Sequence, residues 1–254
     1  MPPPEPLRLQ REIRFEGVKF RYAADGPLIL DGLDLSIPKG IRIGIMGGTG
    51  TGKSTLLDLL LGLLEPTDGA ILVDGRPIGG ARLRAWQRSV AHVPQSIYLA
   101  DSTIAENIAF GVPPQAIDMA RVRQAAAEAQ IADFIEGLPH AYATSVGERG
   151  IRLSGGQRQR VGIARALYKR GSVLVFDEAT SALDNVTEQS VMETIERLDR
   201  DLTIIIIAHR VTTVRHCDRL VELIGSRTVE YRSYEHMVES SPSARHAGVQ
   251  GHHV

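Results

Sequence analysis

Short hydrophobic runs bounded by turn residues fill the first part of the chain and predict a series of strands. Hydrophobic and polar residues alternate over residues 13–20, as in a half-buried strand, whereas residues 41–46 are apolar and β-branched enough for a buried one. The pairs Asp68-Gly69 and Asp74-Gly75 predict turns. The predicted strands here are residues 13–20, 33–37, 41–46, 70–73 and 89–93. Their close spacing predicts a small antiparallel sheet.

The pattern changes to helical spacing after residue 95. Residues 96–169 are mostly helical, with an interruption at 147–150, and predict an inserted helical subdomain. Two nearly continuous apolar runs, residues 173–176 and 203–208, then predict buried strands that alternate with helices. Such alternation is typical of a mainly parallel sheet covered on both faces. The predicted fold class is therefore α/β, with an antiparallel β subdomain and an α-helical subdomain beside the parallel core. The helices predicted around the apolar runs are residues 158–168 and 186–198.

Composition places the chain among globular proteins. Hydrophobic residues make up 43% and charged residues 23% of its 254 residues, and the formal net charge is −1. This balance argues against nucleic-acid binding through a broadly basic surface, although it leaves room for a local basic patch. The single cysteine, Cys217, excludes an internal disulfide and fits a reducing compartment. We expect it to be a small buried hydrophobe.

The two ends of the chain differ from the rest. Residues 1–12 begin with a Pro-rich stretch that predicts a stiff linker and lacks the basic and apolar regions of a signal peptide. A linker at this position suggests that another segment normally precedes it. Residues 240–254 are polar and predict a disordered tail, so one domain is expected over residues 13–239. No apolar run approaches the roughly 18 residues that cross a bilayer.

A glycine-rich turn joins the predicted strand 41–46 to a helix whose leucines recur at helical spacing up to Pro66. Glycines let successive backbone N–H groups face a phosphate, and the helix N-terminus favours the same anion. Lys53 adds a cation for the β- and γ-phosphates, and Ser54 adds a hydroxyl for Mg²⁺. A flexible turn capped by Ser54 is the alternative, but the flanking strand and helix favour a nucleoside-triphosphate site. The phosphate-loop pattern G-x-x-x-x-G-K-[ST] lies within Gly47-Gly48-Thr49-Gly50-Thr51-Gly52-Lys53-Ser54-Thr55.

Polar side chains follow several predicted buried strands directly. They are Gln95, the pair Asp177-Glu178, and His209. Because ligands of open α/β sheets bind outside the carboxyl ends of the strands, we expect these groups to converge on the phosphate loop. Asp177 suits a metal shell, Glu178 suits a general base or water-orienting group, and His209 suits a γ-phosphate contact. The alternatives are acids that complement a helix dipole and a histidine with a structural hydrogen bond.

Six ordered motifs over residues 13–239 resemble those of the ABC-type ATPases. Leu153-Ser154-Gly155-Gly156-Gln157 resembles the signature motif, which other phosphate-loop enzymes lack, and Ser154 lies 23 residues before Asp177. Tyr22 resembles the adenine-stacking aromatic, Gln95 the Q-loop, residues 181–184 the D-loop and His209 the switch histidine. The resemblance implies a P-loop NTPase core that binds ATP and Mg²⁺ and hydrolyses ATP. Ser54, Gln95 and Asp177 would then complete the metal shell, with Gln95, Glu178 and His209 catalytic.

The resemblance also implies partners. Ser154, Gly155, Gly156 and Gln157 would bind the ATP held by a second ABC cassette, as a homodimer or a heterodimer. The helix after Ser154 is a second anion site in a chain with one phosphate loop, although Ser154 also suits a plain N-cap. Residues 95–101, 104–108 and 148–150 resemble the exporter-type subgroup, where they face the coupling helices of a transmembrane domain. We therefore expect a cassette at the cytoplasmic face of a membrane, held there by a domain outside this chain, with no nucleic-acid partner.

Two other functions are weighed against this one. Soluble ABC ATPases of DNA repair or translation usually carry two cassettes or a long coiled coil, and neither is visible in this sequence. A nucleotide-gated module without turnover usually lacks groups such as Glu178 and His209, which are present. The departures from the family are Thr49 and Thr51 in place of Ser, Arg232 in place of Gly, and the divergent residues 225–228. Because of these departures, the resemblance does not define the last strands or their packing.

Overall fold

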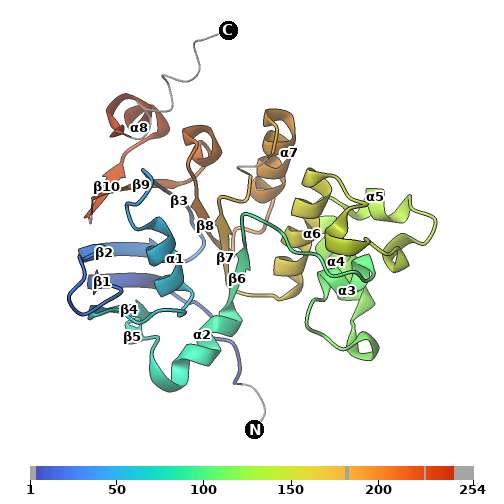
Figure 1. Ribbon diagram of the computed structural model, residues 1–254, viewed down its shortest axis with the longest axis horizontal. Coiled ribbons are helices and arrows are strands. Elements are labelled where there is room, and N and C mark those ends of the chain that lie inside the picture. The colour runs from blue at the N-terminus through green and yellow to red at the C-terminus, as the bar shows by residue number, and fades with distance from the viewer. Residues whose placement is uncertain (1–3, 181–182, 226, 243–254) are drawn as a thin grey trace. The chain divides into compact units, whose positions relative to one another are not determined.

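The chain divides into two compact units in the computed structural model, which describes residues 4–180, 183–225 and 227–242. The first unit comprises Met1–Val90, Ser172–Glu178 and Arg200–Val254. The second comprises Ala91–Gly171 and Ala179–Asp199. The predicted α/β class is confirmed, with an antiparallel sheet, a mainly parallel sheet and a helical region (Figure 1).

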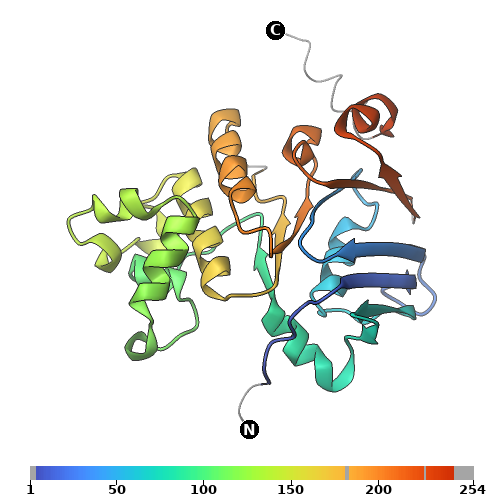
Figure 2. The same cartoon turned by 180° about the vertical axis from the view of Figure 1, so that it is seen from behind.

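An antiparallel sheet in the order β2-β1-β4-β5 belongs to the first unit, and β1 and β2 lie side by side in both views (Figure 2). Along β1 the buried positions change phase: Ile13 and Phe15 are buried, and then Val18 and Phe20. A β-bulge at Gly17, whose φ is +56°, inserts the extra residue that keeps both halves on one face. The strands are β1 (Glu12–Phe20), β2 (Leu30–Pro38), β4 (Asp68–Val73) and β5 (Arg76–Pro77). The turn predicted at residues 68–69 is thus wrong, because β4 already includes them.

The larger sheet has the strand order β10-β9-β3-β8-β7-β6. Strands β9, β3, β8 and β7 pair in parallel with one another, whereas β10 is antiparallel to β9, as predicted for a mainly parallel sheet. The central strands β3 and β8 are buried at every residue, which explains their continuous apolar sequences. The strands are β3 (Arg42–Gly47), β6 (Val90–Val93), β7 (Val173–Asp177), β8 (Thr203–Ile207), β9 (Arg219–Ile224) and β10 (Arg227–Tyr231).

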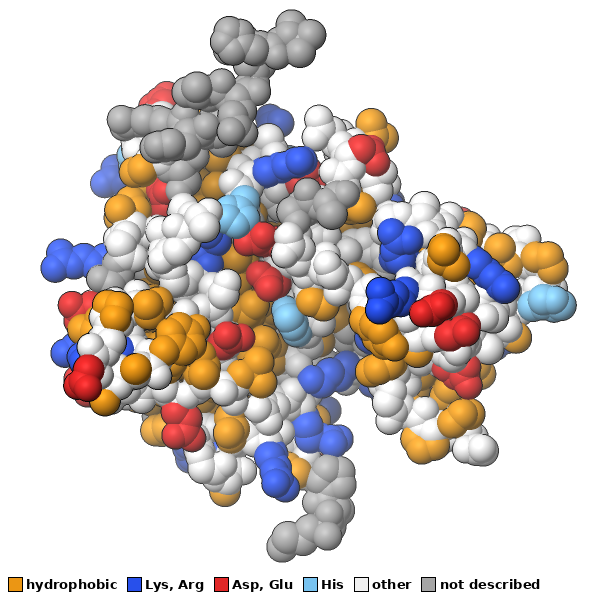
Figure 3. Space-filling model, in the orientation of Figure 1, with side chains coloured by type: hydrophobic (Ala, Val, Ile, Leu, Met, Phe, Trp, Pro, Cys, Tyr) orange, Lys and Arg blue, Asp and Glu red, His pale blue; other side chains and the backbone are white. Residues whose placement is uncertain are grey.

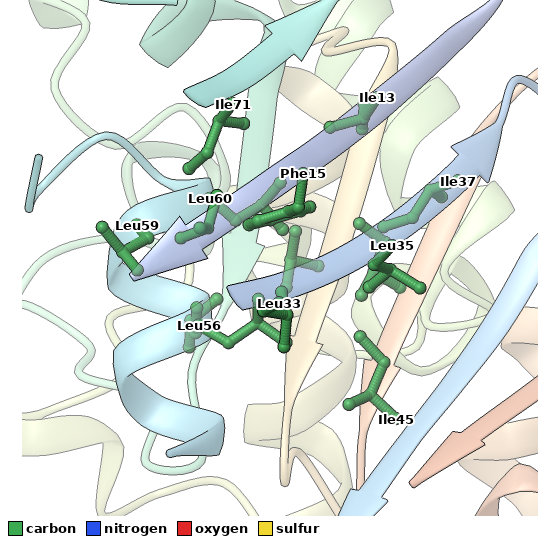
Figure 4. Packing of buried hydrophobic residues seen from close by; sticks show 14 of the residues in the cluster. Ile13, Phe15, Leu33, Leu35, Ile37, Ile45, Leu56, Leu59, Leu60 and Ile71 are labelled. Atoms are coloured by element: carbon green, nitrogen blue, oxygen red, sulfur yellow. The ribbon is translucent and has the colours of Figure 1, made fainter. Parts of the chain in front are cut away.

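Helix α1 (Lys53–Leu60) packs its leucines against the antiparallel sheet (Figure 4). The helix ends at Leu60, shortly before Gly62, whose φ is +66°. Leu63 therefore lies outside the helix and is 64% exposed, so the prediction that the helical spacing of the leucines continues this far is wrong. Helix α2 (Leu83–Ser89), which the sequence analysis did not predict, places the buried Trp86 beneath α1. The Trp86 indole Nε1 donates to the Leu60 carbonyl at 2.6 Å. Helix α1, which follows the phosphate loop, is therefore held by the packing of its leucines and, at its last residue, by the bond from Trp86.

The second unit is mostly helical, as predicted, and its helices gather together in both views (Figures 1 and 2). Helix α6 begins at Gly155, three residues earlier than predicted, with Ser154 as its N-cap. The α-helices are α3 (Ile104–Ile108), α4 (Met119–Glu128), α5 (Ala132–Glu136), α6 (Gly155–Tyr168) and α7 (Asn185–Glu196). Short 3₁₀ helices are η2 (Pro114–Ala116), η3 (Ala141–Ala143) and η4 (Glu148–Gly150), with η1 (Gly80–Arg82) and η5 (Val211–Val214) in the first unit.

The ends of the described chain pack on the first unit. Leu9, within the predicted linker, is 1% exposed and belongs to the hydrophobic core. At the other end β9 and β10 form a hairpin, and helix α8 (Tyr234–Ser240) follows after Arg232. Cys217 is half-buried rather than fully buried. Most of the predicted tail lies outside the described residues, and no described helix is long and apolar enough to cross a membrane.

Candidate active site

The phosphate loop lies between β3 and α1, as predicted. Gly50 and Gly52 have φ of +80° and +96°, a left-handed backbone that side chains disfavour. Gly52 is the N-cap of α1, and no side chain caps this helix, so the alternative of a turn capped by Ser54 is wrong. The first N–H groups of α1 thus keep no side-chain partner, which is the condition for binding an anion there.

Lys53 lies inside the loop that precedes it. Its Nζ donates to the carbonyls of Gly47 at 2.7 Å and Gly48 at 2.9 Å, and Thr51 Oγ1 donates to the same Gly48 carbonyl at 2.9 Å. The residue is only 6% exposed. Burial lowers the pKa of Lys53, while the nearby carboxylates of Glu178 and Asp177 raise it. A buried ammonium and two carboxylates therefore share one electrostatic environment.

Asp177 ends β7 and is half-buried. Burial raises its pKa, and the carboxylates of Glu178 and Asp58 raise it further, while Lys53 and His209 lower it. The sequence analysis did not single out Asp58. Its place on α1, four residues after Ser54 and so on the same helix face, is the signal that would have found it. Because the carboxylates of Asp177, Glu178 and Asp58 outnumber the Lys53 ammonium, binding of an added cation is favourable at this site.

Glu178 and His209 form a direct pair at the ends of β7 and β8. His209 Nε2 lies 2.7 Å from Glu178 Oε1, with the carboxylate side chain 18% exposed and the imidazole 43% exposed. Glu178 has a left-handed backbone at φ +48°, and its N–H donates to the Ile207 carbonyl at 2.9 Å. Such a conformation costs a non-glycine residue about 1–3 kcal/mol and occurs preferentially at functional sites. The structure thus brings together Lys53, Asp177, Glu178 and His209, as predicted.

Tyr22 follows β1 and is 65% exposed. Its ring packs edge-to-face against Phe20 with centroids 4.9 Å apart, and its hydroxyl is 3.1 Å from the Thr55 Oγ1 of α1. Tyr22 therefore packs against its neighbours without being buried in the core. The ring is tethered at both ends, and its exposure leaves a surface on which a flat ligand can stack.

The remaining predicted site residues belong to the second unit. Gln95 is exposed and lies two residues after β6. At the start of α6, Ser154 Oγ accepts from the Gln157 N–H at 3.2 Å, and Gln157 Oε1 accepts from the Ser154 N–H at 2.8 Å. Ser154 is therefore an N-cap within a capping box. Of the D-loop, residues 181–182 lie outside the described part, and Asp184 caps α7. That Gln95 and the signature approach a nucleotide stays a prediction.

The oxygen atoms that the first unit offers suit a Mg²⁺ ion that is bound together with the phosphates of a ligand. Among the described residues, no three His, Cys, Asp or Glu side chains are grouped to hold a metal by themselves. The Ser54 hydroxyl is exposed and the Asp177 carboxylate is half-buried, and both offer oxygen atoms. Mg²⁺ commonly takes one or two carboxylates and completes its shell with substrate phosphates and water.

The parallel sheet, the glycine-rich loop and the acidic strand end define a phosphate-loop NTPase. A family model described as ABC transporter matches residues 30–181, more than half of the chain. The chain therefore belongs to the ABC transporter family, as its motifs predict.

Relatives indicate the branch of the family. The chain is 41% identical over 233 residues to the "ATP-dependent lipid A-core flippase" of Ralstonia nicotianae, covering 91% of this chain and 39% of that protein. It is 40% identical to the "Heterocyst differentiation ATP-binding protein HepA" of Nostoc, covering 91% and 38%. A solved bacterial Atm1-family ABC exporter with ATP bound is 38% identical with a TM-score of 0.84, covering 98% of this chain and 44% of that one.

These relatives confirm an exporter-type ATP-binding cassette and favour it over a soluble ABC ATPase of DNA repair or translation. The chain spans about two fifths of the length of the curated relatives that it matches.

Proposed function

We propose that the chain binds and hydrolyses ATP to drive an exporter-type transmembrane domain. The observation that carries this proposal is the group at the carboxyl ends of β3, β7 and β8: the buried Lys53, the half-buried Asp177 and the Glu178–His209 pair. Each member has a separate task in phosphoryl transfer, and the strand ends place them where an α/β sheet binds its ligand.

The residues of the proposed site divide the tasks of binding and hydrolysis among them. Gly47 to Thr55 bind the phosphates, with the Lys53 ammonium on the β- and γ-phosphates, and Tyr22 stacks on the adenine. Ser54, Gln95 and Asp177 hold Mg²⁺, which neutralises charge on the transferred phosphoryl group when it is bound. Glu178 accepts a hydrogen bond from the attacking water, and His209 fixes the carboxylate and contacts the γ-phosphate.

The Tyr22 assignment predicts a graded loss of ATP affinity. Stacking of a base on an aromatic ring contributes about 1–3 kcal/mol, so Tyr22→Ala is expected to raise the Kd for ATP about 5- to 150-fold. Tyr22→Phe and Tyr22→Trp keep an aromatic ring and are expected to bind nearly normally, because the partly buried hydroxyl bond to Thr55 is a small contribution. Calorimetric titration measures the three constants. Equal losses for Ala and Trp would instead assign Tyr22 a folding role.

The purified chain is expected to hydrolyse ATP only with Mg²⁺. Without the cation, Asp177, Glu178 and Asp58 face the phosphates uncompensated, so EDTA should reduce phosphate release to background while excess Mg²⁺ restores it. Phosphate release is measured with and without EDTA, and with Ca²⁺ as a control for non-specific screening. Turnover that persists in EDTA contradicts the metal assignment.

A second cassette completes the proposed site. One chain carries one phosphate loop and one signature. The capping box of α6 uses the N–H of Gln157, so the N–H groups of Gly155 and Gly156 are the ones that can face an anion. We propose that Ser154 and Gly155–Gln157 bind the γ-phosphate of ATP held by another copy or a related chain. Two nucleotides then lie between two cassettes in a head-to-tail dimer.

Exposed aromatic side chains of the second unit support docking of a transmembrane domain at the cytoplasmic face of the membrane. Tyr98 is 61% exposed and Phe110 is 54% exposed. The Arg165 guanidinium lies 4.6 Å from the centroid of the Phe110 ring and donates to the backbone carbonyl of Tyr98 at 2.9 Å. One cation therefore packs on the ring of Phe110 and holds the backbone of Tyr98. Hydrophobic side chains also lie among charged ones on the visible surface (Figure 3). Phe110 was not singled out from the sequence, where it lies two residues after the exporter-like stretch 104–108.

The docking proposal predicts a selective defect for Phe110→Asp. Truncation of a central aromatic typically weakens an interface about 30-fold or more, so the cassette should separate from its transmembrane domain and lose transport. ATP binding by the isolated chain should stay normal. Leu63→Asp, at a residue of the first unit that is 64% exposed, is the matched control. Normal association of the Phe110 variant in a co-purification assay would refute this surface.

A further inference from the structure

We infer that α6 and α7 form one rigid platform, and that Arg160 is the positioning residue that joins them. The inference rests on the proposed function, because the signature lies at the start of α6 and the D-loop leads into α7. The two helices are neighbours in both views (Figures 1 and 2). In the proposed dimer, both of these segments would approach the partner's nucleotide as a single body.

Arg160 makes an unusually complete set of hydrogen bonds for one side chain. Its Nη2 donates to Ser190 O at 3.0 Å and Ser190 Oγ at 2.7 Å, and its Nη1 donates to Thr194 Oγ1 at 2.7 Å. The same Nη1 lies 3.2 Å from the Ala129 carbonyl and 3.3 Å from the Gln130 carbonyl, at the end of α4. Three of the five contacts therefore reach α7, each more than one turn from its start.

The partial burial of Arg160 makes this contact specific. The bond to Thr194 is partly buried and the two bonds to Ser190 are exposed, and partial burial lowers the pKa of the guanidinium. Displacing α7 would remove three of the five bonds and leave the guanidinium only the Ala129 and Gln130 carbonyls. The bonds thus resist sliding of the two helices more strongly than apolar packing does, because hydrogen bonds are directional.

The start of α6 touches α7 independently of Arg160. A Cβ added at Gly156 would lie 2.5 Å from Thr187 Cγ2, and one added at Gly155 would lie 3.3 Å from Leu183 Cδ2. The signature glycines therefore have a packing role here, in addition to any phosphate contact: they let the first turns of the two helices approach closely. Contact exists at the start of the helices and again at Arg160.

Asp184, the last residue of the D-loop, and Thr180, the residue before this loop, both form hydrogen bonds with α7. Asp184 accepts from the Thr187 N–H at 3.0 Å and from Thr187 Oγ1 at 2.7 Å. On the other side, the buried Thr180 Oγ1 donates to the buried Glu188 Oε1 at 3.0 Å. A displacement of α7 therefore displaces Thr180 and Asp184. Arg160, through α7, sets where these two residues lie relative to the signature.

Hydrogen exchange in the monomer tests the platform directly. Arg160→Met keeps much of the side-chain length but removes all five bonds, and amides of residues 185–194 are expected to exchange about tenfold faster or more. Arg121→Met is the matched control: Arg121 is another partly desolvated arginine of the second unit, and its guanidinium packs 4.4 Å from the Tyr168 ring of α6. It should leave residues 185–194 unchanged.

A second variant covers the case in which Arg160→Met does not fold. Ser190→Ala combined with Thr194→Val keeps Arg160 but removes both hydroxyl partners, and a smaller increase of exchange in residues 185–194 is expected. Normal exchange in the variants that fold, or equal increases for Arg121→Met, would overturn the platform.

Dimerisation tests what the platform does. In a Glu178→Gln background, Arg160→Met is expected to weaken ATP-dependent dimerisation about tenfold. The Kd of the monomer for ATP should change less than about twofold, because Lys53 and Tyr22 lie in the first unit. Faster exchange without weaker dimerisation would overturn the positioning role. If Glu178→Gln alone stays monomeric with ATP, the dimer proposal itself fails and the positioning role fails with it, whereas hydrogen exchange still decides the platform.

Discussion

Lys53→Ala is expected to abolish detectable ATP hydrolysis and to weaken ATP binding sharply. The ammonium is buried within the loop and held by the carbonyls of Gly47 and Gly48, so it is already oriented when the triphosphate arrives. Removing one partner of a desolvated charge pair costs about 2–5 kcal/mol, which corresponds to a rise in Kd of roughly 30- to 5,000-fold. Phosphate release and calorimetric titration measure the two effects.

Lys39→Ala is the matched control for this variant. Lys39 is also in the first unit, just before the strand that leads to the phosphate loop, but it is exposed. Its removal should change neither the Kd nor the turnover. Turnover of Lys53→Ala at the rate of the unmodified chain would show that the phosphate loop is not the site of hydrolysis.

Glu178→Gln is expected to slow hydrolysis by about 10²–10⁴, the usual contribution of general acid–base assistance, while ATP binding is retained. Glutamine keeps the size of the side chain but cannot act as a base. The substitution also removes the carboxylate that lies 2.7 Å from the Nε2 of His209. Single-turnover measurements separate the chemical step from binding.

His209→Ala tests whether the pair acts as a unit. If Glu178 and His209 serve one step, the double variant should be little slower than the slower single variant, because residues that act together are strongly non-additive. Rate losses that multiply would indicate independent roles. Glu230→Gln removes an exposed carboxylate from an ion pair with Arg219 in the same unit, and it should leave turnover unchanged.

The buried strands and the phosphate loop were predictable because their information is local. A central parallel strand such as β8 must be apolar at nearly every position, and the loop pattern fixes its own strand-to-helix context. The convergence of Asp177, Glu178 and His209 also followed from sequence, because they come directly after such strands.

Local turn chemistry and short elements were harder to predict. The bulge at Gly17 keeps both halves of β1 on one face, although the sequence alone suggests one uninterrupted alternation. Helix α2 has too few apolar residues to show a helical period, and its position depends on the Trp86 bond to Leu60. At α6 the glycines suggested a turn, but the capping box of Ser154 and Gln157 starts the helix there.

Residues that act through distant contacts had no sequence signal of their own. Arg160 and Arg165 occupy the same helix and are chemically identical, yet one joins α7 and the other supports Tyr98 and Phe110. Their partners lie 30 or more positions away along the chain, and only the packing of the second unit pairs them.

The measurement that tests the shared-site proposal most directly is the mass of Glu178→Gln in solution, by size-exclusion chromatography with light scattering. With ATP and Mg²⁺ the variant should accumulate as a dimer, because the nucleotides that bridge Lys53 of one copy to Ser154 of another are no longer consumed. The unmodified chain should stay largely monomeric, and a bulky acid at Ser154 in the Glu178→Gln background should abolish the dimer by placing negative charge against the γ-phosphate. A Glu178→Gln chain that binds ATP tightly yet remains monomeric at high concentration would contradict the account and leave a self-contained phosphate-loop ATPase.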